Sequence, residues 1–160
     1  MKMFRPIRRK TKEIDEEAAK ELLRKERIGI LAVNGDDQYP YAIPVNFRYD
    51  EEKNRIYFHG AGAGHKYDSL KVCDKVCFTV CGKEVVRDLA WAPYVKSAVV
   101  FGRCRLQEKN EESMDQLRKL AAKYFPNEEL IEEEMQKAGR AAQMYEIEIE
   151  HLSGKEIQER

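Results

Sequence analysis

The order of the strand-like segments is the feature that most constrains the fold of this chain. Continuous or alternating apolar residues occupy six stretches: 27–34, 39–50, 55–60, 75–82, 96–106 and 142–156. Helical patterns fall between them too rarely for repeated strand–helix–strand units, so most strands follow one another in hairpin order. The sequence therefore predicts a mainly β protein with peripheral helices, a six-stranded antiparallel barrel, and disfavours a doubly wound parallel sheet.

Two prolines restrict the position of the strand over 39–50. Pro40 and Pro44 have no N–H to donate to a neighbouring strand, so we expect this strand at a sheet edge or with one side free for another group. Gly102 is predicted to mark a bulge or bend in the strand over 96–106. Helices are predicted from an Asp15 N-cap to about residue 26, and over 66–72, 111–124 and about 128–137.

Composition excludes several classes of protein. The 160 residues suit one domain, predicted to span 1–160. Lys plus Arg and Asp plus Glu both number 29, so the chain lacks the positive field of a nucleic-acid binder. No apolar run is long enough for a membrane span, and no apolar segment follows the first basic residues as in a secretory signal. We expect a cytoplasmic protein with no nucleic-acid or membrane partner.

Two groups of residues invite a functional reading that the sequence does not favour. The basic cluster Arg5, Arg8, Arg9, Lys10 and Lys12 is expected to be a solvated lead-in, with a nucleic-acid arm as the alternative. The cysteines at 77 and 81 lie four residues apart on a predicted strand, about 13 Å, which is too far for both to bind one zinc ion. We expect neither a metal site nor disulfides.

The stretch "RIYFHGAGAGHKYDSL", residues 55–70, carries the clearest chemical signal. Its three alternate glycines permit positive φ and close approach of a ligand, and the amides of such a loop can form an anion nest. A helix start follows and adds partial positive charge, and Lys66 adds a full charge at its first turn. The stretch indicates a phosphate site, with a flexible glycine turn and a surface lysine as the alternative. It matches neither a Walker loop nor the dinucleotide fingerprint.

The strings "RRK", "IGILAVNGDDQYPYAIPVNF", "IYFHGAGAGHKYDSL", "CFTV", "YVKSAVVFGR" and "LSGK" cover nearly the whole chain in one order. In this order the chain resembles the FMN-binding split-barrel superfamily of pyridoxamine 5'-phosphate oxidase-like proteins. Within that superfamily it is most similar to the Nim-type 5-nitroimidazole-resistance branch. The resemblance implies a homodimeric six-stranded barrel with FMN bound at the subunit interface. Val99, Val100 and Phe101, beside Trp91, are candidates for covering an apolar sheet face.

The resemblance also assigns cofactor-binding residues. It implies that the pair His65 and Lys66 holds the FMN phosphate, although the oxidases carry Ser-Arg-Lys where this chain has Gly-His-Lys. It implies that Ser97 is a polar flavin contact. It also implies that the loop beside the ribityl chain is formed by His59, Ala61, Gly62, Ala63 and Gly64. The strand whose backbone lies against the isoalloxazine ring is matched by Pro44, Val45 and Asn46. No clear match exists for the residues that hold pyridoxal phosphate.

The cofactor is predicted to carry out the chemistry, while the protein orients the substrate and excludes water from the site. His59, at the end of a strand, is the candidate proton donor, with a histidine satisfied by a loop carbonyl as the alternative. Trp91 and Tyr94 are candidates for an aromatic wall that binds a flat substrate, with ordinary packing as the alternative. We expect a flavin-dependent oxidoreductase that takes electrons from a nicotinamide and passes them to a small flat acceptor such as a nitroimidazole.

Three other functions stay open on the same barrel. One is a pyridoxamine-phosphate oxidase, which needs a second phosphate site beside the flavin. Another is a flavin carrier or sensor without turnover. The third holds haem or a deazaflavin, with His59 or His151 as an iron ligand.

Overall fold

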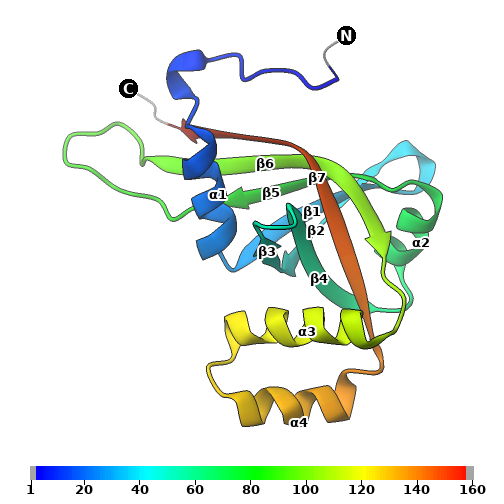
Figure 1. Cartoon of the computed structure of the whole chain (residues 1–160). Coiled ribbons are helices and arrows are strands. Elements are labelled where there is room, and N and C mark those ends of the chain that lie inside the picture. The colour runs from blue at the N-terminus through cyan, green and yellow to red at the C-terminus, as the bar shows by residue number, and fades with distance from the viewer. Residues whose placement is uncertain (1–2, 158–160) are drawn as a thin grey trace.

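The computed structural model describes residues 3–157 and shows a curled antiparallel sheet with helices at its periphery (Figure 1). The sheet order is β2-β1-β5-β6-β7-β4-β3, and every neighbouring pair is antiparallel. The first two and last three residues of the predicted 1–160 domain lie outside the described residues. The strands are β1 (Ile28–Asn34), β2 (Pro40–Asn46), β3 (Arg48–Asp50), β4 (Arg55–Ala61), β5 (Lys75–Cys81), β6 (Val95–Leu106) and β7 (Ala142–Ile157).

The prediction of six strands was wrong, because the strand expected over 39–50 is divided at Phe47. β2 and β3 lie at opposite edges of the sheet although Phe47 alone separates them in the chain. The Phe47 side chain is fully buried in the core, and its N–H donates to the Tyr124 hydroxyl at 2.9 Å instead of to a strand. The expectation of an edge strand was correct, since β2 with its two prolines is one edge.

The core lies inside the curl of the sheet. Strand residues of one alternating face are buried there, among them Leu31, Phe78, Val100 and Ile147. Val100 was expected on the outer face with Val99 and Phe101, and that expectation was wrong. Period-two alternation places it inward, while Phe101 is 37% exposed.

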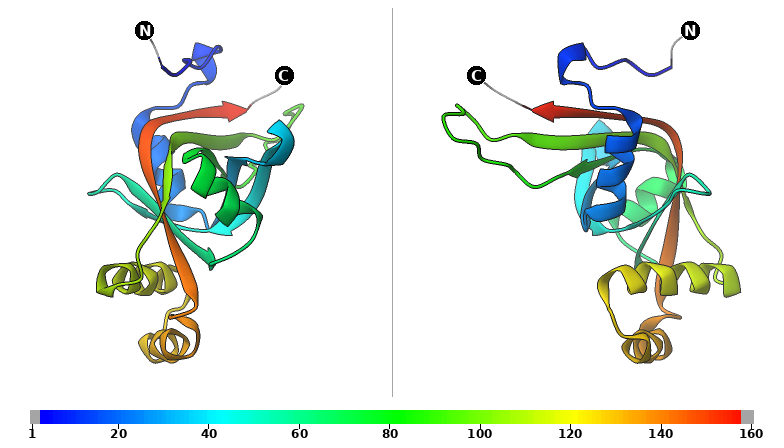
Figure 2. Two further views of the ribbon diagram at one scale, coloured as in Figure 1. Left: turned by 90° about the vertical axis from the view of Figure 1, so that its right-hand side faces the viewer. Right: turned by 60° about the vertical axis from the view of Figure 1, so that its left-hand side comes forward.

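Helices close the two ends of the curl. α1 (Glu16–Lys25) begins at Asp15, whose side chain accepts a hydrogen bond from the Ala18 N–H at 2.8 Å, and it buries Leu23 in the core. α2 (His65–Val72) follows β4 and buries Leu70. α3 (Glu111–Tyr124) and α4 (Glu128–Ala138) lie together below the sheet (Figure 2). They form a second apolar cluster against the outward residues Tyr57 of β4 and Met144 of β7.

The predicted bulge at Gly102 is confirmed. The pairing register of β6 and β7 shifts between Phe101 and Gly102. A Cβ at Gly102 would lie 2.2 Å from the Glu148 carbonyl oxygen, so the close approach of the two strands requires glycine. No helix within residues 3–157 is long and apolar enough to cross a membrane.

Candidate functional site

An open cleft of about 740 Å³ lies between the α3–α4 pair and the outer side of the sheet. Its size falls in the range of small-molecule sites, and its walls are mostly apolar. Two of the predicted site residues, His59 of β4 and Asn46 of β2, meet there although they come from strands on different sides of the sheet order. The remaining walls include Ile28 of β1, Tyr124 of α3 and Met135 of α4.

His59 reaches the cleft because of strand alternation. It shares a face of β4 with Tyr57, which packs under α3 and α4, while Phe58 points into the core. His59 is exposed at the mouth of the cleft, but the protein atoms around the imidazole partly desolvate it and so lower its pKa, and the positive charge of Lys66 lowers this pKa further. The ring is therefore neutral at pH 7, when it offers one N–H donor and one acceptor nitrogen.

The glycine loop leads from β4 into an uncapped helix. Gly64 is the N-cap of α2 with φ of 114°, a conformation that only glycine adopts readily, and no side chain caps the first-turn amides. These amides remain available for an anion. Positive φ was expected at all three glycines of the loop, and among them the structure has it only at Gly64. A Cβ at Gly62 would meet no atom within 4 Å.

His65 and Lys66 extend to different parts of the molecule. The His65 ring stacks on Tyr41 with centroids 4.0 Å apart, and its Nε2 lies 3.7 Å from an oxygen of Asp36. The Lys66 ammonium lies 5.7 Å from the centre of the Tyr145 ring, and next to Gly60, where a Cβ would be 2.7 Å from Nζ. No carboxylate pairs with Lys66 among residues 3–157. Its charge is therefore available beside the loop.

The residues predicted on β2 divide between the two faces of that strand. Pro44 is exposed on the outer face, opposite Ile30 of β1. Val45 points the other way and packs against the core, so only its backbone is available to a ligand. The Asn46 side chain donates to the Arg27 carbonyl oxygen at 3.1 Å, which fixes the amide at the rim of the cleft.

Ser97, Trp91 and Tyr94 lie far from this cleft within one chain. Ser97 pairs with Lys155 of β7, whereas Ala61 at the glycine loop pairs with Ala142, thirteen residues earlier on the same strand. At about 3.3 Å per residue this corresponds to roughly 40 Å along the curved strand. Trp91 and Tyr94 belong to the hairpin arm, residues 82–94, which extends from the body on the side opposite α2 (Figure 1).

The hairpin arm exposes much of its apolar surface. Trp91 is 82% exposed, and Val86 and Leu89 are also exposed. Tyr94 is held within the arm, since its backbone pairs with Val85 and the Arg87 guanidinium lies 4.1 Å from its ring centre. The predicted aromatic wall is therefore not assembled against His59 within one chain.

Sequence patterns did not identify the polar residues that join α3 to the cleft. The Tyr124 hydroxyl lies 2.7 Å from the Arg27 carbonyl oxygen, to which it donates. The Lys123 ammonium donates to the carbonyl oxygens of Glu26 and Phe47 at 2.6 and 3.0 Å. Burial and the nearby Arg27 charge lower the pKa of Lys123 to about 8. These contacts join residues at least 76 positions apart, so no local pattern marks them.

Metal-binding chemistry has no visible basis in the described part of the chain. Residues 3–157 contain no group of three or more His, Cys, Asp or Glu side chains placed to hold a metal ion. Of the four cysteines, Cys104 is buried and Cys81 is exposed, and all four are free thiols.

Comparison with solved structures shows the same fold in several bacterial proteins. A proposed 5-nitroimidazole antibiotic resistance protein from Bacteroides thetaiotaomicron superposes with a TM-score of 0.74 at 19% identity, covering 90% of this chain and 86% of that one. An FAD-binding protein from Mesorhizobium loti gives 0.64 at 19% identity, covering 91% and 97%. An FAD and heme binding protein from Mycobacterium smegmatis gives 0.74 at 18% identity, covering 93% and 74%.

No curated protein matches the sequence. The family model for pyridoxamine 5'-phosphate oxidase matches residues 15–156, far more than half of the chain. The matched segment includes the cleft, the glycine loop and the hairpin arm. This chain belongs to the pyridoxamine 5'-phosphate oxidase family, whose members bind flavins.

Proposed function

We propose that the protein is an FMN-dependent oxidoreductase that reduces small flat acceptors such as nitroimidazoles. The observation that carries the proposal is the adjacency of two features. An uncapped helix start with an unpaired lysine lies at the end of β4, and the same strand presents His59 to an open cleft of about 740 Å³. An anion site beside an apolar cleft suits a flat cofactor with a phosphate tail.

The residues of this chain fit the flavin phosphate at the start of α2. The first-turn amides of α2 would donate to phosphate oxygens, and Lys66 would supply the opposite charge. Glycine at position 64 permits the backbone conformation that begins the helix. The cofactor, when bound, supplies the electron transfer chemistry.

His59 and Asn46 orient the bound molecules in the cleft. The neutral His59 ring can donate one hydrogen bond to a flavin edge or a substrate oxygen. Because its pKa is lowered, little of the ring is protonated at pH 7, and its capacity to deliver a proton increases at lower pH. Water shares the proton delivery. The apolar walls from α3 and α4 give a flat molecule a surface to lie against, and such a molecule would displace water from that part of the open cleft.

A second copy of the chain completes the site in this proposal. The residues matched to flavin contacts fall into two groups that one chain keeps apart, the cleft group with His59 and Lys66 and the distant Ser97. The exposed arm with Trp91 and the outer face with Ile28 and Phe101 also leave apolar surface uncovered. A homodimer would bring the two groups of flavin contacts together and would cover the apolar surface, if each arm lies near the cleft of the other copy. Trp91 and Tyr94 would then contact the substrate.

The test is a redox titration of the purified protein. After FMN is added and the excess is removed, we expect the protein to show an absorbance spectrum typical of oxidised flavin. NADH or NADPH should bleach this spectrum. A 5-nitroimidazole should then restore it in the absence of oxygen. If no nitroimidazole reoxidises the bound flavin, the result would support a flavin carrier or sensor in place of the proposed enzyme. Bleaching of the oxidised flavin by pyridoxamine phosphate, followed by reoxidation with oxygen, would instead assign a vitamin oxidase.

The choice of cofactor is tested by the same spectra. We propose FMN, while two of the similar structures are named for FAD, and one of these also for heme. Competition between FMN and FAD for the apoprotein measures the preference directly. A Soret band after haem is added, lost in a His59→Ala or His151→Ala variant, would support the haem alternative in place of ours.

A further inference from the structure

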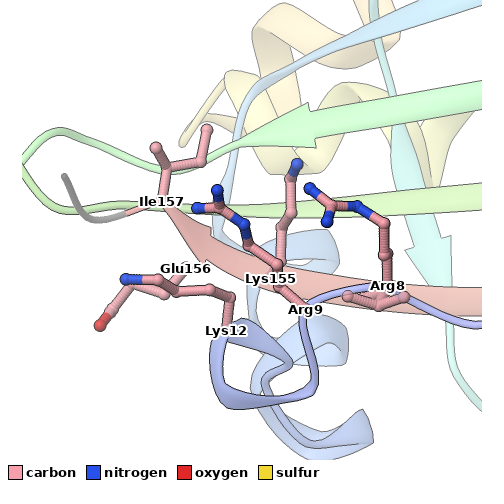
Figure 3. Close-up of a pocket in the computed structure, with 7 residues that line it drawn as sticks. Arg8, Arg9, Lys12, Lys155, Glu156 and Ile157 are labelled. Atoms are coloured by element: carbon pink, nitrogen blue, oxygen red, sulfur yellow. The ribbon is translucent and has the colours of Figure 1, made fainter.

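A basic hollow at the end of the sheet far from the glycine loop joins the two ends of the described chain. It has a volume of about 260 Å³ and is lined by four cationic side chains and one acid, with two isoleucines completing it: Arg8, Arg9, Lys12, Lys155, Glu156, Ile7 and Ile157. Figure 3 shows the nitrogen atoms of Arg8, Arg9 and Lys155 pointing to the same side of the segment. The amino-terminal cluster was expected to be a solvated lead-in, and Arg5, Arg8, Arg9 and Lys10 are indeed exposed, while the backbone that carries them lies along the last strand.

The hollow is held in shape by contacts on both of its sides. On one side the Ile14 N–H donates to the Gly154 carbonyl oxygen at 3.0 Å, and Glu13 forms a backbone bridge with Lys155. A Cβ at position 154 would lie 2.8 Å from Ile14 and 3.0 Å from the Ser97 carbonyl oxygen, so glycine lets the segment seat here.

On the other side, the amino-terminal segment is held by ring stacking. The Phe4 ring stacks on His151 at 5.0 Å and on Phe101 at 5.5 Å between centroids. The segment that carries Arg8 and Arg9 is thus fixed at both ends. The guanidinium groups are presented from a supported backbone and not from a free tail.

Most of the cationic side chains in the hollow have no carboxylate partner in the described part of the chain. Within residues 3–157, Arg8, Arg9 and Lys155 have no carboxylate partner, whereas the adjacent Lys10 pairs with Glu13 at 2.9 Å. Arg8, Arg9 and Lys155 against the single acid Glu156 leave a local surplus of positive charge among the described residues, in a chain whose formal net charge is zero. Gathering like charges costs free energy unless an anion occupies the space between them.

We propose that the basic hollow binds a compact phosphate anion, such as diphosphate or the phosphate group of a nucleotide. Arginine forks match phosphate oxygens in bidentate geometry, and a charge surplus suits an anion with two or more negative charges. A volume of about 260 Å³ is below the usual range for drug-sized ligands, so the hollow holds the anionic group and leaves the rest of a larger ligand outside.

This site is separate from the proposed flavin phosphate site in the same chain. Lys155 lies near one end of β7, and Ala142, which pairs with the end of β4 at the glycine loop, lies at the other. The two sites can therefore be removed one at a time. Lys66→Ala addresses the flavin site, and Arg8→Gln/Arg9→Gln addresses the basic hollow.

The test is calorimetric titration of diphosphate into FMN-saturated protein at low ionic strength, where screening is weak. We expect one diphosphate per chain. The Arg8→Gln/Arg9→Gln variant should bind it at least about tenfold more weakly, because two charge-assisted contacts are lost. Lys10→Gln is the matched control, since it removes one charge from the same turn outside the hollow, and it should change the affinity less than about twofold.

Two further measurements separate the outcomes. Diphosphate should raise the Tm of the wild type and not of the double arginine variant, which also shows whether that variant folds. AMP in place of diphosphate distinguishes nucleotide phosphates from small inorganic anions, and binding of either that depends on Arg8 and Arg9 supports the proposal. No diphosphate binding in the millimolar range, or binding that survives loss of both arginines, would overturn it. If diphosphate binding persists in Lys66→Ala while FMN binding is lost, the two sites are independent.

Discussion

The cleft end of the molecule and the hairpin arm differ in the solvent exposure of their aromatic residues. At the cleft end, Phe47 and Tyr57 are buried, and Tyr124 is hydrogen bonded to two backbone groups. In the arm, Trp91 is 82% exposed. Burying apolar area is the main source of folding free energy, so the first region stabilises the single chain and the second cannot. This difference supports the proposed homodimer, in which the apolar residues of the arm contact a second copy of the chain.

Replacing Phe47 should show the largest effect. Phe47→Ala removes a fully buried ring between β2 and β3, and we expect the free energy of unfolding to fall by about 3–5 kcal/mol. The matched change in the arm, Trp91→Ala, should cost less than about 0.5 kcal/mol in the single chain. Urea denaturation at several protein concentrations measures both. Equal costs at high dilution would remove the distinction between the regions.

Replacing His59 should slow turnover without releasing the cofactor. We expect His59→Ala to keep most of its FMN affinity and to reduce a nitroimidazole about 10²-fold more slowly. Because its pKa is lowered below 6.5, His59 donates protons more effectively as the pH falls, so the ratio of wild-type to variant rate should increase toward acid. His151→Ala is the control, since that ring stacks on Phe4 away from the cleft. A variant that loses flavin yet keeps its rate at saturating FMN would reverse the assignment.

Replacing Lys66 should weaken cofactor binding. Loss of one charge-assisted contact corresponds to roughly 1.5–3 kcal/mol, so we expect Lys66→Ala to bind FMN about ten- to a hundredfold less tightly. Lys71→Ala, in the last turn of the same helix, should bind as the wild type does. Fluorescence titration of FMN measures the difference. Unchanged affinity in Lys66→Ala would place the phosphate elsewhere.

The smallest expected effect concerns the pH dependence of stability at Lys123. The pKa of Lys123 is about 8 in the folded chain and 10.5 for an ordinary lysine, so the unfolded chain binds more protons between these two values. Stability from this group therefore rises as the pH increases from 8 toward 10.5, and is constant below 8. Relative to Lys123→Met, we expect the wild type to gain about 1 kcal/mol between pH 8 and pH 10, reduced from the full shift by solvent screening. A constant difference over that range would contradict the lowered pKa.

Most of the fold could be predicted from the sequence because its signals are local. Alternation placed Tyr57 and His59 on one face of β4, and the periodicity of α3 and the bulge at Gly102 were both confirmed. The division at Phe47 could not be predicted in this way. It depends on the Tyr124 hydroxyl, 77 residues further along the chain, which accepts the Phe47 N–H.

The candidate site was predictable only where it lies on one segment. The glycine loop and Lys66 are contiguous, so the pattern of residues 60–66 indicates an anion site directly. The cleft needs β1, β2, β4, α3 and α4 together, and the hollow needs both ends of the chain. Such contacts depend on tertiary packing, for which a single sequence carries no local period. Resemblance could name Ser97 as a flavin contact, but it could not show that one chain keeps it away from the loop.

The division at Phe47 also affects how this protein avoids aggregation. An open sheet has two edges whose free N–H and C=O groups can template pairing with another chain. Here one edge is β2, in which Pro40 and Pro44 have no N–H to offer, and the other is β3, which is only three residues long. The stretch 39–50 thus forms both edges of the sheet, and neither edge strand is a good template for fibril growth.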